Sequence, residues 1–127
     1  MKKRTLIIGI ATTLAALVPL AAIAAANDAD VRQGGSCTGS TSAKIKLSPE
    51  DGGIETEFEV DQNRTGVTWK VTLRRNGKVA ARTQATTAGR SGSFEVRRVL
   101  ADGQGSDSIS ARAVSPSGEV CTAGASI

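Results

Sequence analysis

The chain has 127 residues, with 16 basic side chains, 12 acidic side chains and no histidine. Without histidine the chain lacks the commonest general base, and every Ser-His or Cys-His nucleophile with it. These composition limits exclude histidine-based hydrolysis. The length is suited to one domain with a modest core.

Residues 1–26 have the layout of a signal peptide. Basic side chains at 2–4 precede an apolar run at 6–23, and alanines at 24–26 supply the small residues that signal peptidase requires. We predict cleavage before Asn27 and secretion of the remaining chain. The alternative is an N-terminally membrane-anchored protein, because an uncharged run of this length can span a bilayer, which takes roughly 20 helical residues.

Removal of the leader would change the electrostatic balance of the chain. Of the 16 basic residues 13 would remain, together with all 12 acidic residues, so the net charge would fall from +4 to +1. A charge this small does not favour attraction to nucleic acid or anionic lipid. The only aromatic residues, Phe58, Trp69 and Phe94, fall on apolar strand faces and are expected in the core. We therefore predict no nucleic-acid partner, and membrane contact only through an uncleaved leader.

The two cysteines delimit the expected folded domain. Residues 27–36 are polar and contain two glycines, which predicts a flexible lead-in before a domain at 37–127. Cys37 and Cys121 form an even pair in an oxidising compartment, without histidine nearby, which favours a disulfide over metal ligation. In chain-entropy models such a closure stabilises by roughly 4–5 kcal/mol. The alternative is a pair of free thiols.

Between the cysteines, side chains alternate between apolar and polar, and glycine-bearing turns interrupt the alternation at short intervals. This pattern is typical of all-β proteins. The clearest strand is 54–60, in which apolar side chains share one face and three glutamates share the other. Further strands are predicted at 44–47, 67–74, 78–86, 93–97, 108–114 and 119–127, which makes seven.

Two local signals refine this pattern. The Asn-Gly dipeptide at 76–77 predicts a two-residue hairpin turn with positive φ at both positions. Such a turn would place Val79 and Ala81 on the polar face, so we predict that 78–86 is an edge strand. The alternation breaks at a doublet of arginines, which predicts a β-bulge near Arg98.

Seven short antiparallel strands with frequent turns, and Trp69 on the third, are typical of a two-sheet sandwich. On strand count and Trp69, residues 37–127 resemble immunoglobulin-like and fibronectin III-like domains. The resemblance implies an architecture and no activity, and it departs from antibody domains because Cys37 and Cys121 occupy the terminal strands. The leader, the Glu-Phe-Glu-Val strand and the closing Gly-Glu-Val-Cys motif at 118–121 are also similar to small secreted proteins of actinobacteria, which lend no mechanism.

The glutamate row is the main candidate for catalysis. Glu55, Glu57 and Glu59 project from one strand face roughly 7 Å apart, a spacing similar to that of paired acids in glycoside hydrolysis. The alternative, which we favour, is a solvated row of cross-strand ion pairs with Lys70 and Arg74 of the next strand. We therefore predict no catalytic residues and a protein that is not an enzyme.

Two loops have some features of calcium sites. Residues 103–109 resemble the later part of a G-G-x-G-x-D-x-U-x repeat, and 61–66 begin with oxygen-bearing side chains. The first occurs in one copy only, whereas these repeats bind calcium by stacking, and the second lacks the distal glutamate of an EF-hand. We predict plain turns at both, with no metal and no cofactor.

The remaining features favour a non-enzymatic secreted module that binds an extracellular protein or a cell-envelope component. The small, uncharged stretch 79–81 on the predicted edge strand is one candidate for pairing with a partner strand. The alternative function is a secreted protease inhibitor, although no disulfide braces a candidate loop, and an acid-based hydrolase comes third. Four arginines are candidates for contact with an acidic partner or for plain solvated surface: Arg90, Arg97, Arg98 and Arg112.

Overall fold

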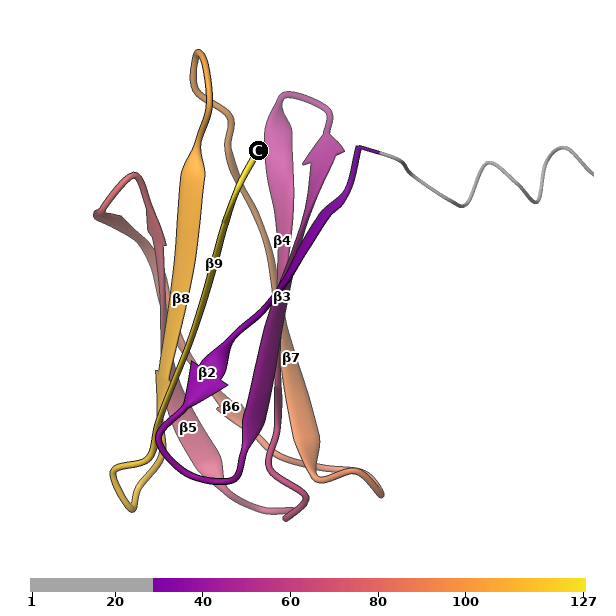
Figure 1. The fold of residues 1–127 in the computed structure, drawn as a ribbon, viewed down its shortest axis with the longest axis vertical. Helices are drawn as coiled ribbons and strands as arrows, with labels where there is room; N and C mark the ends of the chain where they lie inside the picture. The colour runs from indigo at the N-terminus through magenta and orange to yellow at the C-terminus, as the bar shows by residue number, and fades with distance from the viewer. Residues whose placement is uncertain (1–28) are drawn as a thin grey trace, which may run out of the picture.

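A computed structural model describes residues 29–127 and contains nine β-strands in two antiparallel sheets (Figure 1). The predicted all-β sandwich is therefore confirmed, with two more strands than the seven expected. The predicted signal peptide lies outside the described residues. Within residues 29–127, no helix is long and apolar enough to cross a membrane.

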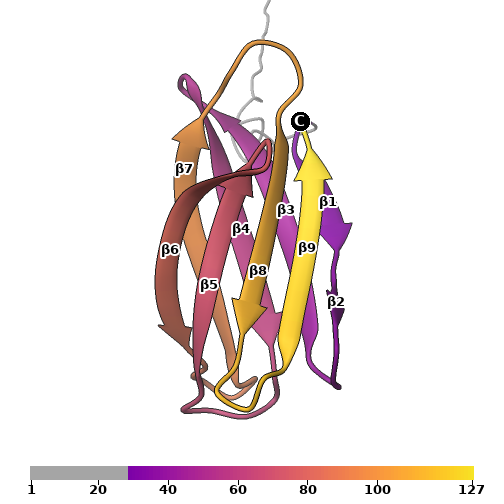
Figure 2. The ribbon, with the colours of Figure 1, turned by 90° about the vertical axis from the view of Figure 1, so that its left-hand side faces the viewer.

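The strand order separates the chain into a four-stranded and a five-stranded sheet. The four-stranded sheet has the order β1 (Val31–Gly34), β3 (Ser42–Glu50), β4 (Gly53–Asp61) and β7 (Ser93–Ala101). The five-stranded sheet has the order β2 (Ser36–Cys37), β9 (Val120–Ser126), β8 (Ser108–Val114), β5 (Thr68–Arg75) and β6 (Lys78–Thr86). Figure 2 looks onto the outer face of the five-stranded sheet, where β6 and β5 lie beside β8 and β9.

The apolar faces of the two sheets meet in one core, as the alternation of period two predicts. Trp69 and Phe58 are fully buried, and Phe94 lies between them, with its ring centroid 6.2 Å from that of Trp69 and 6.4 Å from that of Phe58. The indole Nε1 of Trp69 donates a hydrogen bond of 3.1 Å to Gln62, so the buried ring keeps a polar partner. All three aromatic side chains are therefore core residues, as expected.

The N-terminal segment differs from its prediction. Residues 31–34, expected in a flexible lead-in, form β1 and pair with β3, and the chain then crosses to the five-stranded sheet as β2. The crossing is made at Gly35, where a Cβ atom would collide with the backbone carbonyl oxygen of Thr122. Strands this short, separated by a required glycine, carry no readable alternation.

The predicted disulfide is confirmed between Cys37 and Cys121. The two residues lie directly opposite each other on β2 and β9, with Cα atoms 4.0 Å apart. The bond therefore joins two neighbouring strands of one sheet, and it closes the chain across 84 positions.

The hairpin at 76–77 is confirmed, with φ of 51° at Asn76 and 84° at Gly77. The edge position of β6 is also confirmed. Val79 pairs with Arg74 and is exposed, as predicted, but the prediction for Ala81 was wrong, because a bulge between Leu73 and Arg74 makes Leu73 pair with Ala81. The extra residue turns Ala81 towards the core, where it is half-buried and packs against the core cluster.

The bulge predicted near Arg98 is absent, because β7 pairs with β4 in an uninterrupted register from Ser93 to Ala101. Arg98 lies opposite the buried Thr56 on the inner face, yet it is exposed. β7 is an edge strand, so a long side chain on its inner face can extend past the rim of the sandwich to solvent. The break in alternation therefore marks a sheet edge and not a bulge.

Candidate functional site

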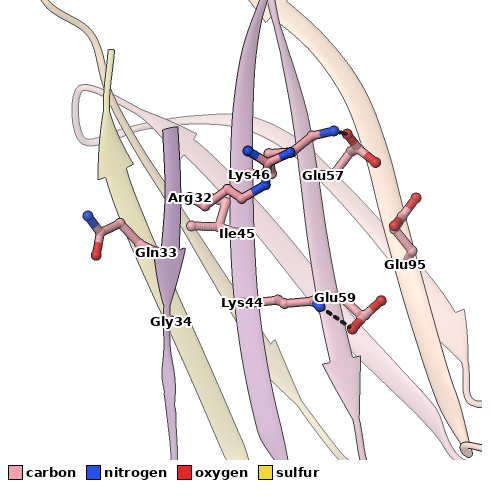
Figure 3. A pocket seen from close by; sticks show the side chains of 9 residues that line it. All are labelled: Arg32, Gln33, Gly34, Lys44, Ile45, Lys46, Glu57, Glu59 and Glu95. Carbon is pink, nitrogen blue, oxygen red and sulfur yellow. Dashed lines mark ion pairs between the residues drawn. The ribbon is translucent and has the colours of Figure 1, made fainter. Parts of the chain in front are cut away.

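The outer face of the four-stranded sheet carries the glutamate row, and each glutamate of the row has a cationic partner. Figure 3 shows the pairs made by Glu57 and Glu59. Lys46 Nζ lies 2.7 Å from Glu57 and Lys44 Nζ lies 3.4 Å from Glu59. Arg97 on β7 pairs with Glu55 from the other side. The ion-pair interpretation of this row is therefore confirmed.

The predicted partners of that row were wrong. Lys70 and Arg74 belong to β5, which lies in the opposite sheet, so neither can reach the glutamates of β4. The strands that pair with β4 are β3 and β7, and these supply the cations instead. Consecutive strands in the sequence can join different sheets, and alternation within each strand cannot show this.

The ion pairs also shift the proton affinities of the groups they join. A hydrogen bond from Lys46 lowers the pKa of Glu57, and the same bond raises the pKa of Lys46. Glu95 stands on β7 beside the row and directly opposite Glu59 (Figure 3). Its pKa is raised, first by desolvation and then by the negative charges of Glu57 and Glu59.

The outer face of the five-stranded sheet has a different charge pattern. Within residues 29–127, the five strands of this sheet contain six cations and no aspartate or glutamate, whereas the four-stranded sheet contains five cations and six acids. Four of the six cations alternate onto the outer face, and we call them the cationic face: Lys70, Arg74, Arg82 and Arg112. No ion pair joins any of the four to a carboxylate of the described residues.

The register places these cations around one central residue, Thr72. Arg82 pairs with Thr72 from β6, and Arg112 pairs with it from β8. The Cα atoms of the two arginines are therefore roughly 10 Å apart across β5. Lys70 and Arg74 flank Thr72 along the same strand, each roughly 7 Å from it. A depression of about 560 Å³ lies over this centre, and Lys70, Thr72, Arg82 and Arg112 are among its lining residues.

This arrangement can attract an anion, and its donors can hold one. Lys70, Arg82 and Arg112 are exposed, so their flexible side chains can follow a ligand above the sheet. The hydroxyl of Thr72 and the amide of Gln84, which pairs with Lys70, add neutral hydrogen-bonding groups to the depression.

The four arginines singled out in the sequence do not form one site. Arg112 belongs to the cationic face, Arg97 pairs with Glu55 on the opposite sheet, and Arg98 donates to the backbone carbonyl of Arg97. Arg90 lies in the turn between β6 and β7. Sequence reasoning missed Lys70, Arg74 and Arg82 as members of a site, although the absence of acids from 67–86 and 108–118 was a usable signal.

The loop at 102–107 has a structural role that explains its aspartate. Asp107 is 1% exposed and accepts hydrogen bonds from Arg75 Nε (3.1 Å), Asn76 Nδ2 (2.9 Å) and the backbone N–H of Gly103 (3.0 Å). The bond from Asn76 contributes most to lowering the pKa of Asp107, while Asp107 raises that of Asp102. Asp107 Oδ1 thus fastens this loop to the β5–β6 hairpin, while Oδ2 accepts the hydrogen bond from Gly103 within the loop.

The other loop with calcium-like features also forms a turn. Asp61 Oδ1 accepts a hydrogen bond of 3.1 Å from the backbone N–H of Asn63, and both Asn63 and Gly66 have positive φ. Among residues 29–127, the one group of side chains that could hold a metal joins Glu119 to Cys37 and Cys121. Its two sulfur atoms form the disulfide, and Glu119 accepts hydrogen bonds from Thr41.

Comparisons with known proteins assign no family to this chain. No protein-family model matches it, and no curated protein matches it in a sequence search. The geometry of the two sheet faces therefore provides the evidence on function.

Proposed function

We propose that this protein is a non-enzymatic, secreted binding module that contacts an extracellular protein or a cell-envelope component through the cationic face. The observation that carries the proposal is the absence of any carboxylate partner, within residues 29–127, for its four cations. On the other sheet of the same domain, Lys44, Lys46 and Arg97 all have one.

Folding does not require this arrangement. Like charges on one sheet face repel each other, whereas pairs of opposite charge contribute roughly 0.2–1 kcal/mol. A face of unpaired cations therefore lowers stability slightly, and a binding role for them accounts for that cost. The glutamates of β4, whose spacing is similar to that of paired catalytic acids, are already occupied by ion pairs.

The pairing of a partner strand with residues 79–81, predicted from the sequence, has less support. β6 is an edge strand, but the bulge falls at Ala80, and bulges disrupt the regular backbone spacing that an added strand needs. The cationic face covers the neighbouring surface and includes Arg82 of β6. We therefore place the contact on the face and not on the edge at 79–81.

The proposal is tested by affinity capture from the secreted and cell-envelope fractions of the source organism. The oxidised protein is compared with Arg82→Gln/Arg112→Gln, and with a control of equal charge change on the other sheet, Lys44→Gln/Arg97→Gln. We expect a component that is retained by the protein and the control but is lost with the first variant. Equal retention by all three, or none by any, contradicts the proposal.

A further inference from the structure

We infer that the cationic face binds a phosphate-bearing polymer without aromatic groups, with Thr72 at the centre of the contact. This inference rests on the proposed function and specifies the chemical class of the partner. It is carried by the placement of four unpaired cations around one polar residue. Three of these cations, Lys70, Arg82 and Arg112, line a depression on the outer face of the sheet.

The spread of the cations favours a ligand with repeated charges over a single small anion. Arg82 and Arg112 are separated by two strand spacings, and Lys70 and Arg74 by four residues of one strand. A single anion can contact only part of this set. A flexible polymer can contact all four cations. Each exposed contact is weak, but each releases counterions from the polymer, so the binding free energy increases with the number of contacts.

The donor types favour phosphate. Arginine offers a planar fork of N–H donors that matches the two anionic oxygens of a phosphodiester, and lysine contributes a point charge. Around them stand neutral donors suited to phosphate oxygens, namely the hydroxyls of Thr72 and Ser110 and the amide of Gln84.

The same face is poorly suited to two other classes of anionic partner. Protein interfaces depend on buried aromatic and apolar anchors, but the outer positions of this sheet carry no aromatic side chain, and their larger apolar side chains are three valines, Val79, Val114 and Val120. Single-stranded nucleic acid needs aromatic stacking platforms. All three aromatic residues of the chain, Phe58, Trp69 and Phe94, are buried in the core.

The charge distribution of the domain also orients such a ligand. The four-stranded sheet carries one more acid than cations, while the five-stranded sheet carries six cations alone. A polyanion is therefore attracted to one side of the sandwich and repelled by excess negative charge on the other. A net charge near zero for the whole domain conceals this separation.

The test measures binding of labelled short-chain inorganic polyphosphate by fluorescence anisotropy over a series of salt concentrations. We expect a dissociation constant that rises steeply with salt. Arg82→Gln/Arg112→Gln should weaken binding at low salt at least about tenfold and should reduce the slope of log affinity against log salt by about 1–2. The control Lys44→Gln/Arg97→Gln, with the same change in net charge, should bind like the wild type. Circular dichroism and the thermal midpoint verify that both variants fold.

The possible results separate this inference from the proposed function. If polyphosphate does not bind, or if polyglutamate or single-stranded DNA binds more tightly, the assignment of a phosphate polymer is overturned while a charge-dependent capture result still supports a binding module. If both double variants weaken polyphosphate binding equally, the contact follows net charge, and the assignment to the cationic face is overturned. If inorganic phosphate competes as strongly as polyphosphate at the same concentration of phosphate groups, the requirement for a polymer is overturned.

Discussion

The two outer sheet faces of this domain use similar residues in opposite ways. On the four-stranded sheet Lys44, Lys46 and Arg97 stand beside glutamates and pair with them. On the five-stranded sheet Arg82 and Arg112 stand beside Thr72, and no described carboxylate is near enough to pair with either. The difference shows that the cross-strand neighbours of a surface cation, and not the strand that carries it, decide whether it forms an ion pair.

The largest expected change in stability comes from removing the disulfide. Among the described residues, this bond lies within the five-stranded sheet, and the four-stranded sheet has none. Replacing both cysteines, as Cys37→Ala/Cys121→Ala, should lower the free energy of unfolding by about 4 kcal/mol, because the unfolded chain regains the entropy of a loop closed across 84 positions. Urea unfolding measures the change. Reduction with dithiothreitol should destabilise the wild type similarly and leave the double variant unaffected; a reductant-insensitive wild type contradicts the prediction.

The second effect concerns the one cation of the five-stranded sheet that has a carboxylate partner. Arg75 pairs with the buried Asp107, so Asp107→Asn should lower the thermal midpoint by on the order of 10 °C. The matched substitution Asp102→Asn alters an exposed side chain and should leave the midpoint unchanged or slightly higher. Equal losses from both substitutions would show that Asp107 is not the fastening residue.

The pKa of Asp107 gives this second effect a pH dependence. The folded-state pKa is lowered below the ordinary value of about 3.9, so the stabilisation is fully present above that value. It is lost as the pH falls through the folded pKa. The difference between the wild type and Asp107→Asn should therefore narrow in acid, as thermal unfolding across the acid range would show.

The third effect compares one lysine from each face. Lys46→Gln removes the 2.7 Å partner of Glu57 and should lower the free energy of unfolding by about 0.5–1 kcal/mol. Lys70→Gln removes an unpaired cation from a face that contains no acid, so it should leave stability unchanged or raise it slightly at low salt. Urea unfolding of the two variants at low and high salt checks this. If both substitutions lower the free energy of unfolding by the same amount, the two faces do not differ electrostatically.

The smallest effect concerns Glu95, whose pKa is raised in the folded state by desolvation and by two neighbouring glutamates. A raised carboxyl pKa means that ionisation destabilises the fold as the pH rises through the folded value. Glu95→Gln should therefore stabilise at neutral pH by less than about 0.5 kcal/mol, because solvent screens this exposed group. The gain should vanish below a pH of about 4.3, where the wild-type carboxyl is protonated in both states. A gain that persists in acid would have a cause other than charge.

Much of the fold could be predicted because its signals are local. The alternation at 54–60 placed Phe58 in the core and the glutamates outside, and the dipeptide at 76–77 predicted a hairpin that the structure confirms. The errors share one origin. The bulge at Ala80, the unbroken register at Arg98 and the crossing at Gly35 all depend on what stands across from the residue, which a single strand does not encode.

The candidate site was not predicted for the same reason. The four cations around Thr72 come from three strands, β5, β6 and β8, and the chain between β6 and β8 passes through the other sheet as β7. Their convergence is visible only when the sheet is assembled. Arg112 was singled out in the sequence, but without its neighbours Lys70 and Arg82.

The sequence alone determined which face of each strand is apolar, which residues turn the chain, and that Cys37 and Cys121 would bond. These properties follow from side-chain alternation, from the backbone freedom of glycine and asparagine, and from thiol chemistry. The tertiary structure alone decided which strands share a sheet, and with it the pairing of the glutamates and the isolation of the cations. Sheet membership depends on contacts between segments far apart in the chain, because the core is buried by whole sheets and not by single strands.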